Sequence, residues 1–79
     1  MDRQTLERHL ALAEGHVLEG ERHLASQRRI LADLERDGHK TTKARQLLAT
    51  LEETQQMHVE DRDRLTRELD RLGPPPRQS

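Results

Sequence analysis

The chain has 79 residues, with 37% charged and 30% hydrophobic residues and no cysteine, phenylalanine, tyrosine or tryptophan. This length allows one domain at most, and the lack of cysteine excludes a disulfide framework or a thiolate metal site. Acidic and basic residues are interleaved and sum to a formal net charge of −1, so we expect no binding to nucleic acid. No apolar run is long enough to span a membrane, and we expect a cytoplasmic protein without a signal peptide.

Residues 3–37 are predicted to form the first helix, with the carboxylate of Asp2 capping its first amides. Apolar and small residues recur there at alternating steps of four and three, which is typical of the contact face of a left-handed helix pair. The seam of this helix consists of Leu6, Leu10, Ala13, Val17, Gly20, Leu24, Gln27, Leu31 and Leu34.

Residues 38–41 are predicted to form a tight turn between two helices. Glycine adopts the left-handed conformation without a Cβ clash, so Gly38 is expected to end the first helix with a positive φ. A threonine follows within a few residues, and its hydroxyl can accept a hydrogen bond from a free amide of the next helix.

Residues 42–72 are predicted to form the second helix, because they repeat the steps of four and three. Gly73 and the three prolines after it end the helix, so residues 1–73 form a hairpin and residues 74–79 a disordered tail. The seam of the second helix consists of Ala44, Leu48, Leu51, Gln55, His58, Arg62, Leu65, Leu69 and Leu72.

Leucine must supply most of the buried area, and two helices that touch along one seam bury little without aromatic residues. We therefore expect an all-α antiparallel hairpin, similar to a coiled coil, that gains further burial from a second chain. A second line of residues on the first helix lies roughly 60–80° around from the seam. It consists of Thr5, His9, Leu12, His16, Glu19, His23, Ile30 and Leu34. Two adjacent contact stripes predict dimerisation into a four-helix bundle.

The middle of each seam is polar, and folding the chain at the turn brings the two polar segments together. Simple folding places Glu21 level with His58, His23 with Gln55 or Gln56, and Gln27 with Glu52. A polar layer of this kind can fix the register and the oligomeric state of packed helices. The predicted layer consists of His16, Glu21, His23, Gln27, Gln55, His58 and Arg62.

A metal site is the alternative interpretation of the histidines. His16, Glu19 and His23 are spaced i, i+3 and i+7, and imidazole with carboxylate suits zinc or another transition metal. Neither the Glu-x-x-His motif of ferritin-like sites nor an HExxH motif occurs, so we expect no cofactor. We also expect no enzyme, because a two-helix body offers no deep pocket and no nucleophile stands beside a base.

Four runs of the sequence resemble a group of short α-helical proteins from soil and plant-associated proteobacteria. These runs are residues 16–23, 37–41, 47–53 and 58–65, namely HVLEGERH, DGHKT, LLATLEE and HVEDRDRL. The resemblance implies a bacterial cytoplasmic protein, and it transfers no catalytic residues. The sequence thus predicts a small interaction or adaptor module that self-associates as a homodimer. The alternative is a metal- or pH-responsive binding protein that uses the histidines in the second line of residues on the first helix.

Overall fold

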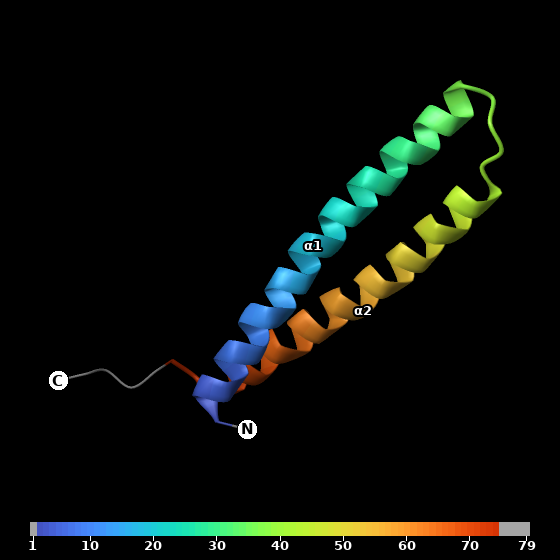
Figure 1. Cartoon of the computed structure of the whole chain (residues 1–79). Coiled ribbons are helices and arrows are strands. Elements are labelled where there is room, and N and C mark those ends of the chain that lie inside the picture. Colours follow the sequence, from blue (N-terminus) through green and yellow to red (C-terminus); the bar gives the residue numbers. More distant parts are fainter. Residues whose placement is uncertain (1, 75–79) are drawn as a thin grey trace.

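The computed structural model describes residues 2–74, which form two antiparallel α-helices joined by a short turn (Figure 1). Helix α1 spans Arg3–Arg36 and helix α2 spans Thr42–Leu72. The predicted all-α hairpin is confirmed, with α1 one residue shorter than expected and the turn one residue longer. The start of α1 and the end of α2 lie together, opposite the turn (Figure 1). Of the predicted tail, Pro74 is exposed and residues 75–79 lie outside the described residues.

The predicted cap and stop of α1 are both confirmed. The Asp2 side chain accepts a hydrogen bond from the Thr5 amide at 2.8 Å, and hydrogen bonding from Thr5 lowers the pKa of this carboxyl. At the other end Gly38 has a φ of 74°. The His39 amide donates to the Leu34 carbonyl and the Gly38 amide to the Glu35 carbonyl, which is the Schellman arrangement.

The start of α2 differs from the expectation, because no threonine hydroxyl caps it. Thr41 precedes the helix, but its side chain makes no capping hydrogen bond. Its backbone, at φ −114° and ψ 0°, is already near the helical region, whereas a capping residue is usually extended. The Thr41 hydroxyl instead accepts a hydrogen bond from Arg45 Nε at 2.9 Å.

Both predicted seams lie between the helices. Every seam residue is buried or half-buried except Leu72, which is 48% exposed at the end of α2. The hydrophobic core lies toward the chain ends, away from the turn. It consists of Leu6, Ala13 and Leu65, with Leu10 and Leu69 packed against it.

The pairs of residues that were predicted to lie level on the two helices, by folding the sequence at the turn, are wrong. The Gln55 side chain reaches the carbonyl of Val17 and not the level of His23, and Gln27 reaches Ala44 instead of Glu52. Gln27 lies about two and a half turns before the end of α1, whereas Ala44 lies in the first turn of α2. Helix α1 therefore extends past the start of α2, and the connection runs back toward α2 (Figure 1).

We expect Gly38→Ala to lower the free energy of unfolding by about 1 kcal/mol, because alanine resists a positive φ. Gly15→Ala is the matched control, since nothing lies within 4 Å of a Cβ added at this helical position. It should raise stability by about 1 kcal/mol through helix propensity alone. Urea unfolding at one protein concentration measures both changes. Equal effects of the two substitutions would contradict the assigned turn.

We expect Leu65→Ala to lower the free energy of unfolding by about 2–5 kcal/mol, because it removes a core side chain. Leu65 is 2% exposed, whereas the control residue, Leu18, is 52% exposed. Leu18→Ala should change stability by no more than about 0.5 kcal/mol. Urea unfolding again provides the measurement, and a small loss for Leu65→Ala would show that the core is placed incorrectly.

Candidate functional site

Two seam glutamines link the helices by reciprocal hydrogen bonds. Gln55 Nε2 of α2 donates to the Val17 carbonyl of α1 at 2.9 Å, and Gln27 Nε2 of α1 donates to the Ala44 carbonyl of α2 at 3.0 Å. Their exposed fractions are 9% for Gln55 and 7% for Gln27, so both bonds lie largely out of water. Burial increases the energetic penalty for breaking either bond, because the amide would then lack a partner.

The Gln55 amide lies directly against the backbone of Gly20. A Cβ added at Gly20 would overlap the Oε1 and Cδ atoms of Gln55, so only glycine leaves room for this side chain. The same oxygen is buried and has no hydrogen-bond partner among the described residues. The Val17 carbonyl can only accept a hydrogen bond, so it must face Nε2 of Gln55. This fixes the orientation of the Gln55 amide and leaves Oε1 without a partner in the described part of the chain. Gly20 is thus a position where the two helices approach each other closely.

His16 and His58 come into contact beside this glutamine. Their ring centroids are 5.1 Å apart and the ring planes are tilted by 40°. Both rings line a groove of about 90 Å³ between the helices, together with Glu19, Gly20, His23, Leu51, Thr54 and Gln55. Pockets for drug-sized ligands are usually about 300–1,000 Å³, so this groove suits an ion or a few waters rather than an organic substrate.

Of the other predicted members of the polar layer, only His23 lines the groove. Glu21 is exposed and makes no ion pair within residues 2–74, so its predicted pairing with His58 is wrong. Arg62 is half-buried, and its guanidinium pairs with Asp63 of its own helix at 3.1 Å. His23 is exposed at the edge of the groove. The His16–His58 contact was missed because the predicted heights were wrong.

The proposed metal ligands share the groove without forming a complete site. His16, Glu19 and His23 all line it, but no group of three or more His, Cys, Asp or Glu in the described part of the chain could hold a metal ion. His16 and His23 are seven residues apart, which is about 10 Å along the helix axis. Zinc–nitrogen bonds are only about 2 Å long, so this spacing separates the two imidazoles too widely.

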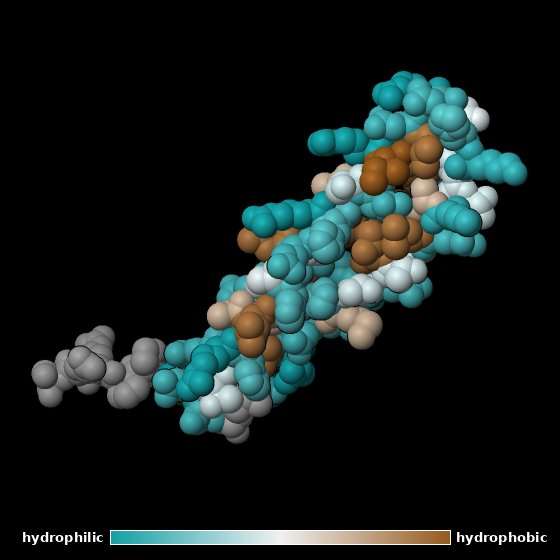
Figure 2. Space-filling model, in the orientation of Figure 1, coloured by the Kyte–Doolittle hydropathy of each residue, from teal (hydrophilic) through white to brown (hydrophobic). Residues whose placement is uncertain are grey.

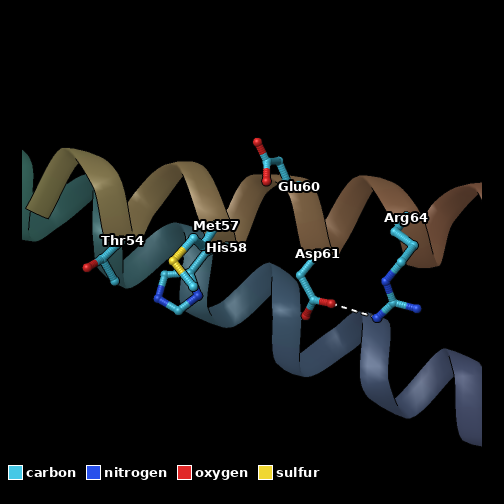
Figure 3. A pocket seen from close by; sticks show the side chains of 6 residues that line it. All are labelled: Thr54, Met57, His58, Glu60, Asp61 and Arg64. Atoms are coloured by element: carbon cyan, nitrogen blue, oxygen red, sulfur yellow. Dashed lines mark hydrogen bonds and ion pairs between the residues drawn. The ribbon is translucent and has the colours of Figure 1, made fainter.

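A second, open hollow lies on α2 beside the groove (Figure 3). Thr54, Met57, His58 and Asp61 point toward the side of α1, whereas Glu60 points away (Figure 3). Asp61 pairs with Arg64 at 2.7 Å, and this hydrogen bond is the main cause that raises the pKa of the Arg64 guanidinium. The open hollow therefore contains one ion pair, between Asp61 and Arg64, while the Met57 side chain stays 68% exposed.

Comparisons with known proteins identify no relative of this chain. No family model, curated protein or solved structure matches the chain. The resemblance to proteobacterial proteins therefore stays a prediction. Neither α1 nor α2, within residues 2–74, is long and apolar enough to cross a membrane.

We expect Gly20→Ala to lower the free energy of unfolding by about 1–3 kcal/mol, because the new methyl group displaces the Gln55 side chain. The control is the same substitution in a Gln55→Ala background, where the overlapping atoms are absent. There it should be neutral or stabilising, since alanine favours a helix by about 1 kcal/mol over glycine. A double-mutant cycle measured by urea unfolding gives the coupling. Equal effects of Gly20→Ala in both backgrounds would show that the two residues do not touch.

Proposed function

We propose that this protein is a small self-associating interaction module in which one face of the hairpin packs on the same face of a second copy. The groove residues His16, Glu19, His23, Leu51, Thr54 and His58 mark this face on both helices. Leu12 and Ile30 continue its line on α1 at helical spacing, and Leu47 and Asp61 continue it on α2. We call these ten residues the histidine face.

The observation that carries the proposal is that the histidine face exposes large apolar side chains and carries little charge. Leu12, Ile30 and Leu47 are 62%, 48% and 49% exposed. Glu19 and Asp61 are its only acidic members, and it contains no lysine or arginine although 37% of the chain is charged. Depletion of charge is the compositional mark of the core of a protein interface. In Figure 2, apolar side chains reach the surface in separate patches along the hairpin.

The shape of the chain supports the same proposal. The radius of gyration is 18.1 Å, against about 12 Å for a compact chain of this length. The accessible surface is 6437 Å², which exceeds by roughly 1,500 Å² the value of about 4,900 Å² typical of a compact 9.2 kDa protein. A standard interface removes about 800 Å² from each partner. The hairpin therefore has ample surface to supply one.

A second hairpin is the occupant that fits best. Two hairpins packed face to face form a four-helix bundle, in which each helix contacts its own partner helix and the other copy. Leu12 lies toward the chain ends, while Ile30 and Leu47 lie toward the turn. Apolar side chains thus flank the histidine groove on both sides, so a second copy meets apolar surface at both ends.

A metal- or pH-responsive binding protein is the second candidate function. One observation favours it, namely the contact of the His16 and His58 rings at 5.1 Å. Both imidazoles lie on the face proposed for self-association, so the two functions are compatible.

We expect sedimentation equilibrium at tens of micromolar to give the mass of two or more chains. Leu47→Glu and Ile30→Glu should shift the protein toward the monomer, because each buries an unpaired charge in the interface. Leu18→Glu is the matched control: Leu18 is 52% exposed, yet lies about 120° around α1 from Leu12 and Ile30.

The control should leave the mass unchanged. A parent chain that is monomeric and still melts cooperatively would refute the proposal. Equal dissociation by Leu18→Glu and Leu47→Glu would show that the histidine face is not the interface.

A further inference from the structure

We propose that His16 and His58 form half of a binding site for a divalent transition-metal ion, best suited to zinc, which a second copy completes. The inference rests on the self-association proposed above, and it assigns the ion a place within that interface. Imidazole nitrogen is a common ligand of zinc, copper and nickel, so these two side chains have the required chemistry.

The separation of the two rings matches that of two imidazoles on one tetrahedral ion. A zinc–nitrogen bond is about 2.0–2.1 Å long and the ring centre lies about 1.2 Å beyond the nitrogen, so two rings at the tetrahedral angle are about 5.2 Å apart. The His16 and His58 centroids are 5.1 Å apart. The distance between the ring centres is therefore compatible with one shared ion.

The hairpin holds the two histidines on rigid elements. His16 directly precedes Val17 on α1, and His58 lies three residues, or about one helical turn, after Gln55 on α2. The hydrogen bond from Gln55 to the Val17 carbonyl therefore fixes the heights of both imidazoles relative to each other. Ligands that project from packed helices are positioned more precisely than ligands on loops.

One chain supplies too few ligands for a closed site. Tetrahedral zinc takes four ligands, and no three His, Cys, Asp or Glu side chains within residues 2–74 are placed so that they could hold one ion together. His16 is exposed and His58 half-buried, so the open side of the pair faces the surface where the second copy packs. The second copy brings the same two imidazoles to this interface. An ion that binds better to the associated form must strengthen association by mass action.

The charges around the pair suit a cation. Glu19 lies in the same groove, and none of the groove residues is a lysine or an arginine. An acidic side chain near a bound cation lowers the electrostatic penalty of binding, whereas a basic one would raise it.

The test compares self-association of the full chain in EDTA with that in one equivalent of zinc chloride per chain, by sedimentation equilibrium. We expect zinc to raise the association constant at least tenfold and EDTA to reverse the increase. His16→Gln and His58→Gln should each abolish the zinc effect. The matched controls His9→Gln and His39→Gln remove histidines outside the pair and should preserve it.

Imidazole NMR signals of the parent chain provide a readout that needs no variant. Zinc should first shift the signals of His16 and His58, and a first shift confined to other histidines would overturn the inference. Association that is equal in zinc and in EDTA would also overturn it, while leaving the self-association proposal intact. A chain that stays monomeric in both conditions would overturn both. Association that occurs only with zinc would support the ion site, and it would overturn self-association of the metal-free chain.

Discussion

The structure depends on two glutamine side chains that reach from each helix to the backbone of the other. Both seams repeat every seven residues, so sliding one helix by a heptad would still place leucine against leucine at the two leucine-rich ends of the seams. Hydrophobic contact alone therefore determines the height of one helix relative to the other only weakly. The bonds from Gln55 to Val17 and from Gln27 to Ala44 select it strongly, because a slide leaves two buried amides unpaired at about 1–3 kcal/mol each.

The same register creates the groove and the contacts within it. With Gln55 level with Val17, its amide fits against Gly20, where no Cβ obstructs it. His16 and His58 then lie beside each other at the mouth of the groove. The polar residues of the seam thus also determine the surface beside it, because the register that they fix places two imidazoles on the charge-poor face of the hairpin.

Self-association and metal binding would share this one face. A thin hairpin buries few residues of its own, with Leu6, Ala13, Val17, Leu24 and Leu65 as its buried hydrophobic side chains in the described part of the chain. Contact with a second copy would extend that core across the apolar ends of the histidine face. An ion held at the groove between them would add ligand bonds to an interface otherwise held by a small apolar area, which links the two equilibria.

The local rules of the sequence determined the two helices, their seams, the Asp2 cap and the glycine stop at Gly38. These features depend on residues within a few positions of each other, so periodicity and capping chemistry suffice to predict them. Only the tertiary structure decided the relative height of α1 and α2, and with it the loss of Glu21 from the polar layer and the gain of the His16–His58 contact. That height follows from hydrogen bonds between residues far apart in the chain. A local spacing of seam residues by four and three positions does not encode such bonds.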